Sequence, residues 1–170
     1  ALFLATGCSN PEEKKSTHFQ SGLNYLKSER PKAAVLEFRN AVQIDPQFAE
    51  ARYQLGLALL ESGEIQEGFQ ELDRAASLDP TNLEALRKTA EILLWANQVE
   101  EGAKRLEQVL NAAPGDTEAM LLMAEVELQR EDHRKAEALV HRILADRPDW
   151  DKAYQVYAKI HAAQGKTLLA

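Results

Sequence analysis

The stretch AVQIDPQFAEA (residues 41–51) places a proline after an apolar run, and an alanine follows five residues after that proline. Three further stretches share this arrangement: AASLDPTNLEA (75–85), VLNAAPGDTEA (109–119) and ILADRPDWDKA (143–153). Consecutive prolines of this set lie 34 residues apart, at Pro46, Pro80, Pro114 and Pro148. A fixed period of this length indicates a repeat architecture in which each repeat is one supersecondary unit.

Each of these prolines predicts the end of a helix, because proline disfavours the α conformation in the residue before it. Between the prolines, apolar residues recur at steps of three and four, which is typical of amphipathic helices. The second repeat shows this at Ala51, Leu55, Ala58, Leu59, then Ile65, Phe69, Leu72 and Ala76. The break at Ser62-Gly63 predicts a turn between two helices, with Gly63 in the left-handed conformation. Asn97 and Gly165 hold the same place in later repeats.

A 34-residue helix–turn–helix unit resembles the tetratricopeptide repeat (TPR) family, and the likeness runs from about Lys15 to the C-terminus. The pattern residues of the first two repeats are Gly22, Tyr25, Ala34, Phe38, Ala41 and Pro46, then Leu55, Gly56, Gly68, Leu72, Ala75 and Pro80. The tryptophan slot of the pattern is filled differently, by His18, Arg52, Leu86, Met120 and Tyr154. The resemblance implies an all-α fold, a right-handed α-solenoid of four complete repeats and a partial fifth. The expected repeats are 15–48, 49–82, 83–116, 117–150 and 151–170.

The fifth repeat contains a first helix, DKAYQVYAKIHAAQGK, and little of a second. A solenoid normally ends in a polar capping helix, and none is visible here. We expect the chain to be the front part of a longer array. The alternative is a true end whose apolar face pairs with another copy or a partner.

The N-terminal stretch ALFLATGC (1–8) is typical of the end of a secretory signal, with an apolar run followed by small residues. Leu4 to Cys8 resembles the bacterial lipobox, in which the cysteine is lipidated and becomes the first mature residue. Cys8 is the only cysteine of the chain, and the alternative is a buried cysteine at a helix start. We therefore expect a signal-peptide end with a lipobox at 1–8 and a polar tether at 9–14. The resemblance implies export to the periplasmic side of a bacterial envelope, as an outer-membrane lipoprotein.

The composition argues against several other classes of function. The chain has 170 residues, of which 45% are hydrophobic and 28% charged, and its net charge of -7 gives no electrostatic footprint for nucleic acid. The four histidines, His18, His133, His141 and His161, show no metal-ligand spacing. No phosphate-binding glycine loop or nucleophile elbow occurs. We expect no catalytic residues, no metal site and no cofactor, and therefore a protein that is not an enzyme.

The resemblance implies that the first helix of each pair lines a groove that takes a partner peptide. The groove residues expected from the first two repeats are Phe19, Leu23, Leu26, Glu50, Tyr53, Leu57 and Leu60. Those expected from the third and fourth are Glu84, Arg87, Glu91, Leu94, Trp95, Glu118, Leu121, Glu125 and Leu128. This floor is apolar near the N-terminus and acidic further along, which suits a segment with apolar and basic residues. The aromatic members can instead complete the packing between repeats.

Together these observations predict a TPR scaffold for protein–protein interaction, anchored to a membrane by lipid. The lipobox, the polar tether and the tandem repeats resemble TPR lipoproteins of exosortase-linked exopolysaccharide systems. They also resemble pilotin-type lipoproteins of pilus or secretin assembly. The alternative is a structural protein that self-associates through its uncapped C-terminal end.

Overall fold

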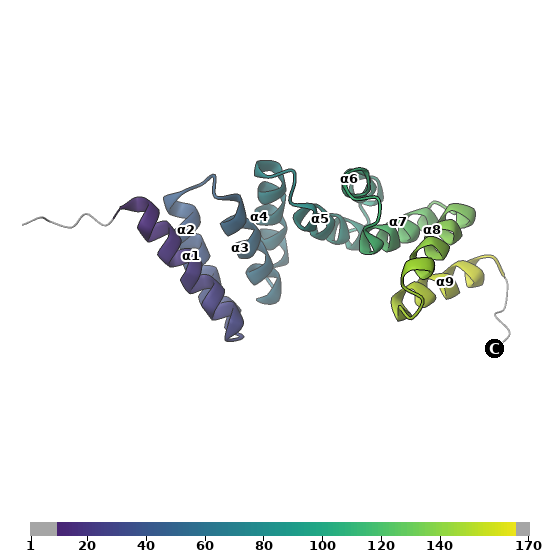
Figure 1. The fold of residues 1–170 in the computed structure, drawn as a ribbon, viewed down its shortest axis with the longest axis horizontal. Coiled ribbons are helices and arrows are strands. Elements are labelled where there is room, and N and C mark those ends of the chain that lie inside the picture. The colour runs from purple at the N-terminus through teal and green to yellow at the C-terminus, as the bar shows by residue number, and fades with distance from the viewer. Residues whose placement is uncertain (1–9, 166–170) are drawn as a thin grey trace, which may run out of the picture. The chain divides into compact units, whose positions relative to one another are not determined.

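The computed structural model describes residues 10–165, and these form two compact units that meet in the sequence between Ala85 and Leu86. Within the described residues all regular structure is helical (Figure 1). The helices are α1 (Pro11–Lys27), α2 (Pro31–Ile44), α3 (Ala49–Glu61), α4 (Ile65–Leu78), α5 (Leu83–Trp95), α6 (Val99–Ala112), α7 (Thr117–Gln129), α8 (His133–Asp146) and α9 (Asp151–Ala163). The predicted all-α fold is confirmed.

Helix boundaries follow the proline period. Helices α2, α4, α6 and α8 end at residues 44, 78, 112 and 146, two residues before Pro46, Pro80, Pro114 and Pro148. Helices α3, α5, α7 and α9 begin at 49, 83, 117 and 151, where we place the starts of the second to fifth repeats. Carboxylates organise the first two linking turns: the Gln47 N–H donates to Asp45 and the Thr81 N–H to Asp79, both at 3.0 Å.

Helix α1 begins at Pro11 instead of Lys15, inside the stretch 9–14 that we expected as a tether. Asn10 caps this start, since its side chain accepts a hydrogen bond from the Glu12 N–H at 3.2 Å. Proline is well tolerated in the first turn, where its missing N–H has no partner to lose. Cys8 and the rest of the stretch 1–8 lie outside the described residues. No helix among residues 10–165 is both long and apolar enough to cross a membrane.

The turn inside each helix pair closes on a residue with positive φ. Gly63, Asn97 and Gly165, which the sequence pattern selects, have φ values of 84°, 58° and 68°. Glu29 and Glu131 occupy the same place in the first and fourth repeats, with φ values of 55° and 62°. The 34-residue period marks both positions, but their residue types give no sign of positive φ, because neither is glycine or asparagine.

The first unit has a core formed by α1, α2 and α3, and α4 packs against α3. Phe38 lies at its centre, fully buried, and a Cβ atom on Gly22 would lie 2.5 Å from the Phe38 Cε1 atom. Gly56 and Gly68 allow a similar approach between α3 and α4, where a Cβ on Gly56 would be 2.6 Å from Leu72 Cγ. The small residues at these crossings therefore have a structural role, because a larger side chain there would clash with the facing helix.

The second unit has its own core, in which α7, α8 and α9 pack together. Its buried members are Met120, Ala124, Ala136, Val140, Ile143, Ala153, Val156 and Ile160. Ala158, which holds the position of Gly22, Gly56, Ala90 and Ala124 in the fifth repeat, is exposed on α9. Asp116 caps α7 by accepting a hydrogen bond from the Ala119 N–H at 2.9 Å.

Candidate peptide-binding groove

The predicted groove residues all lie on α1, α3, α5 and α7, the first helices of the four pairs. Since the two units are separate bodies, the groove consists of two parts that are described one at a time. The first part belongs to α1, α3 and the first turn of α5, where Glu84 is exposed. The second part belongs to the rest of α5 and to α7.

The aromatic residues of the first part are buried. Phe19 is 6% exposed and Tyr53 8% exposed. The Phe19 ring lies between two other rings, with centroid distances of 5.8 Å to Phe38 and 5.0 Å to Phe48. Of the two roles that we considered for these aromatics, their burial favours packing.

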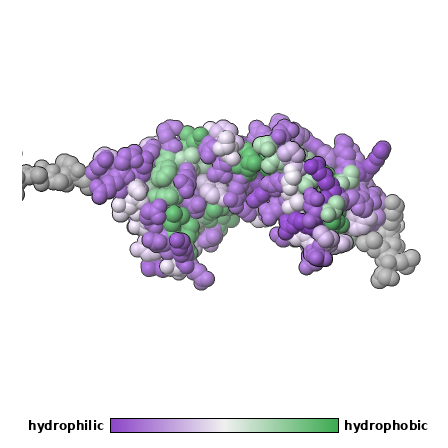
Figure 2. Space-filling view, in the orientation of Figure 1, coloured by the Kyte–Doolittle hydropathy of each residue, from purple (hydrophilic) through white to green (hydrophobic). Residues whose placement is uncertain are grey.

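The leucines of the first part also contribute to packing. Leu23 and Leu26 pack against the core of the first unit, and Leu60 lies against Gly68 where α3 crosses α4. Leu57 keeps part of its surface in solvent, and Glu50 is exposed. Hydrophobic surface is visible over the first unit on a face that is otherwise largely hydrophilic (Figure 2). Leu57 and Glu50 are thus the members of this part most accessible to a ligand.

The second part contains a cavity of about 220 Å³. Its lining residues are Arg87, Lys88, Glu91, Glu118, Leu121, Leu122, Trp150 and Lys152. Four of these, Arg87, Glu91, Glu118 and Leu121, are predicted groove residues. They reach the cavity because α5 and α7 present the same face one repeat apart, and the start of α9 supplies the remaining wall.

The charges of this cavity are organised by two ion-pair groups. Arg87 holds two carboxylates, with Nη1 at 2.9 Å from Asp116 Oδ2 and Nη2 at 3.2 Å from Glu118 Oε2. Lys88 Nζ lies 3.1 Å from Glu91 Oε2. The cavity therefore carries both signs of charge, whereas the glutamates alone predicted an acidic floor. A ligand with both an apolar and an ionic group fits this lining.

Two tryptophans in the second unit differ in their surroundings. Trp95 at the end of α5 is 74% exposed, which is unusual for a side chain of this size. Trp150 lines the cavity and is covered on one face by Arg147, whose Cζ lies 4.0 Å from the ring centroid. Trp95 is a predicted groove residue, and its exposure leaves it free to contact a partner.

The remaining predicted residues of the second part have structural contacts. Leu94 lies against Gly102, where a Cβ atom would be 2.9 Å from Leu94 Cδ2. Leu128 packs against the core of the second unit. Glu125 pairs with Lys159, at 2.9 Å from its Nζ. These three residues therefore stabilise the helices that form the groove, and their contacts are with the protein itself.

Four cavity residues are absent from the prediction: Lys88, Leu122, Trp150 and Lys152. Lys88 and Leu122 are 34 residues apart on the flanks of α5 and α7, so the repeat period relates them once one is known. Trp150 and Lys152 come from the next repeat, and the pattern of the first helices cannot indicate them. Among residues 10–165, no three histidine or acidic side chains are grouped so that they could hold a metal ion.

Family models for repeats of this kind match most of the chain. A model described as "Tetratricopeptide repeat" matches residues 59–116 and 96–160, and one described as "TPR repeat" matches residues 22–63. The chain belongs to the tetratricopeptide repeat family. TPR proteins bind protein or peptide partners and are in general non-enzymatic interaction scaffolds.

Solved TPR structures share this fold. MamA from Desulfovibrio magneticus RS-1 is 22% identical, with a TM-score of 0.82 over 90% of this chain and 86% of that one. YrrB, a TPR protein with an unusual peptide-binding site, is 20% identical, with a TM-score of 0.75 over 84% and 74%. PilF of Pseudomonas aeruginosa is 20% identical, with a TM-score of 0.65 over 92% and 79%. A comparison with curated protein sequences gave no match.

Proposed function

We propose that this TPR protein is a lipid-anchored scaffold that recruits or positions a partner protein in the bacterial envelope. The assembly that this scaffold serves is an exopolysaccharide export or secretion system, or the machinery that assembles pili. The sequence around Cys8 supports the anchor, since the lipobox pattern precedes a polar stretch. Attachment by two or more acyl chains is stable, because each buried CH₂ group contributes about 0.8 kcal/mol. The anchor would hold the repeats at the membrane on its periplasmic side.

The cavity of the second unit carries the scaffold proposal. It is lined by four residues that the family resemblance selects, and Trp95 stands exposed on one of its helices. A partner segment that fits this cavity has an apolar side chain that contacts Leu121 and Leu122. It also has a basic group that pairs with Glu118, whose side chain is 55% exposed. Aromatic and apolar anchors of this kind dominate the binding energy of many interfaces.

A site-specific crosslinking experiment tests the groove. A photoreactive phenylalanine analogue replaces Leu121 in the full-length protein, and a matched variant carries it at Tyr154, which is 50% exposed on α9 and does not line the cavity. We expect one partner to crosslink from position 121 and not from 154. The double variant Trp95→Ala, Glu118→Lys should reduce affinity for that partner at least tenfold without loss of helical circular dichroism. Equal crosslinking from both positions would contradict the proposal.

Mass spectrometry of the protein recovered from bacterial membranes tests the anchor independently. We expect a mature protein that begins at Cys8 and carries acyl chains, found in the outer-membrane fraction. Cys8→Ser should abolish both the modification and the membrane association. An unmodified thiol at Cys8 in a cytoplasmic protein would exclude the proposed location and leave the groove proposal intact.

Self-association through α9 is the second candidate function. The observation that favours it is Tyr154, whose large side chain is half exposed. Light scattering over a concentration series measures the oligomer directly, and Tyr154→Lys should dissociate it if this face is used. A monomer at every concentration excludes this candidate.

A further inference from the structure

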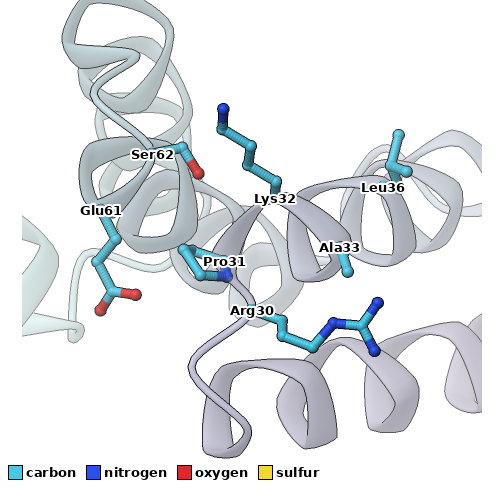
Figure 3. Close-up of a pocket in the computed structure, with 7 residues that line it drawn as sticks. All are labelled: Arg30, Pro31, Lys32, Ala33, Leu36, Glu61 and Ser62. Atoms are coloured by element: carbon cyan, nitrogen blue, oxygen red, sulfur yellow. The ribbon is translucent and has the colours of Figure 1, made fainter.

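One edge of the first unit carries two neighbouring shallow cavities away from the groove. The first, named here the basic cavity, has a volume of about 570 Å³ and is drawn in Figure 3. It is lined by Arg30, Pro31, Lys32, Ala33, Leu36, Glu61 and Ser62. The second, the acidic cavity, has a volume of about 650 Å³ and is lined by Gly63, Glu64, Ile65, Gln66, Glu67, Gln70 and Glu71. The lining residues continue directly from Ser62 to Gly63, so the two cavities adjoin.

The two cavities occupy the same place in successive repeats but differ in charge. Residues 30, 31, 32, 33 and 36 of the first repeat correspond to 64, 65, 66, 67 and 70 of the second, each 34 residues later. Arg30 is thereby replaced by Glu64, and Ala33 by Glu67. Lys32 is replaced by the neutral Gln66. The edge therefore alternates from positive to negative within one unit.

The basic residues are available to a ligand. Arg30 and Lys32 are exposed, and neither forms an ion pair with any described residue. The Arg30 guanidinium lies over the Tyr25 ring, with its Cζ 4.9 Å from the centroid, which holds it in place and leaves its N–H groups free to donate. Glu61 is the one acidic residue of this lining, so the cavity keeps a net positive charge.

The acidic cavity keeps a net negative charge. Arg39 Nη2 lies 2.8 Å from Glu67 Oε1 and 3.7 Å from Glu64 Oε2. One guanidinium thus faces two carboxylates, and one negative charge is left uncompensated. Glu71 pairs with the buried Arg52 and adds nothing to this balance.

Each cavity also presents a large apolar side chain to solvent. Leu36 in the basic cavity is 61% exposed, and Ile65 in the acidic cavity is 46% exposed. They are two of the four exposed large hydrophobic side chains among the described residues. Ile65 is flanked by the carboxylates Glu64 and Glu67, and Leu36 is flanked by the cationic Arg30 and Lys32. The two patches thus have the same layout, an apolar side chain among charged groups, with opposite signs of charge.

We propose that this edge binds a second copy of the same chain across a two-fold axis. A positive and a negative patch side by side on one edge are self-complementary under such an axis, because each patch then meets its opposite on the other copy. Ile65 of each copy packs in the basic cavity of the other, and Glu64 and Glu67 face Arg30 and Lys32. The contact involves one edge of a single unit, and we expect a weak dimer. It depends neither on the groove nor on the lipid anchor.

A charge-swap experiment on the full chain tests this edge. The first variant, Arg30→Glu with Lys32→Glu, makes both patches acidic, and the second, Glu64→Lys with Glu67→Lys, makes both basic. Sedimentation velocity over a concentration series should show a dimer for the original protein and an at least tenfold weaker one for each variant alone. An equimolar mixture of the two variants should form a heterodimer, since every patch again meets its opposite.

The control variant, Lys104→Glu with Arg134→Glu, makes the same change in net charge as the first variant, but on the second unit, and should keep the original dissociation constant. Circular dichroism shows whether each variant keeps its helices. A monomer at millimolar concentration overturns the proposal, and so does a mixture of folded variants that stays monomeric. The proposal is also overturned if Tyr154→Lys abolishes the dimer while both edge variants keep the original dissociation constant. That result would assign the contact to α9.

Discussion

The positive-φ residues show how a single position sets the energy of a turn. Glu29 and Glu131 hold a conformation in which the Cβ atom of an ordinary residue crowds the following carbonyl group. Gly63 holds the same conformation without this crowding, and nothing would lie within 4 Å of a Cβ atom there. The turn is therefore constrained by backbone dihedral angles and not by side-chain contacts.

Replacing Glu131 by glycine should stabilise the protein. The gain in the folded state exceeds the added flexibility of the unfolded chain, and we expect a net increase of about 0.5 to 1 kcal/mol in the free energy of unfolding. Urea unfolding followed by circular dichroism measures this change. Gly63→Ala is the matched reverse substitution and should lower the free energy of unfolding by a similar amount. A gain in both variants would show that dihedral strain does not set the energy of these turns.

Gly22→Ala should destabilise the first unit. The new methyl group would lie 2.5 Å from Phe38 Cε1, and the Phe38 ring is fully buried and cannot swing away. Overpacking of this kind costs about 1 to 3 kcal/mol and outweighs the better helix propensity of alanine. The control is Gly115→Ala, where nothing lies within 4 Å of the added Cβ atom. Thermal unfolding that ranks the two variants in the opposite order would contradict this packing argument.

At the scale of the helices, α1 is tied to the turn after α2 by an ion pair. Lys15 Nζ lies 2.8 Å from Asp45 Oδ2. The hydrogen bond from Lys15, with a second from the Gln47 N–H, holds the pKa of the Asp45 carboxyl below its usual 3.8. A carboxyl whose pKa is lowered by folding contributes stability above its unfolded pKa, and this contribution is lost as the pH falls through the folded value.

Asp45→Asn should therefore destabilise the protein at neutral pH and have no effect in strong acid. Asparagine retains an acceptor for the Gln47 N–H, so the substitution removes mainly the charge interaction with Lys15. The difference in urea midpoint between the two proteins should be constant above about pH 5 and shrink as the pH falls below 3.8, until it vanishes in strong acid. Asp149→Asn is the control, since Asp149 forms no ion pair with any residue of 10–165. A difference that persists in acid would assign the effect to something other than the charge.

The helix pairs could be predicted from the sequence, but the surroundings of some side chains could not. The prolines at 34-residue intervals predict where the pairs begin, because proline acts on the backbone of its own neighbours. Arg52 occupies the tryptophan slot of the family pattern and is only 7% exposed. Its Nε donates to the Pro46 carbonyl at 2.8 Å, and its Nη1 donates to Glu71 on another helix. Local sequence does not reveal such burial, because the partners come from a turn and from the following helix.

The groove was predicted only in part for the same reason. Arg87 and Leu121 are related by the repeat geometry, and the structure brings both to one cavity. Phe19 and Tyr53 match the groove positions equally well, yet both are buried. Whether a groove position faces solvent depends on the size of its neighbours, here Phe38 and Phe48 in the case of Phe19. A repeat pattern therefore predicts on which face of a helix a side chain lies, but not how much of that side chain is exposed to solvent.

On the scale of the whole molecule, each unit has its own hydrophobic core. Ile143 is fully buried in the core of the second unit, and Ile143→Ala should cost about 2 to 4 kcal/mol there. Because repeat proteins are stabilised by contacts between neighbours, hydrogen exchange should accelerate in α7, α8 and α9 and stay unchanged in α1, α2 and α3. An equal acceleration in all helices would show that the molecule unfolds as one cooperative body.

The packing of each helix on its neighbours in the sequence also has a consequence for biosynthesis. The contacts that build the first unit join α1 to α2, α2 to α3 and α3 to α4, so each helix meets partners that the ribosome has just produced. Chains rich in local contacts fold in microseconds to milliseconds, whereas translation of 34 residues takes about 2 to 7 s. Because folding is fast compared with chain synthesis, each helix pair packs on the one before it as soon as both are available, and the array grows from its N-terminal end.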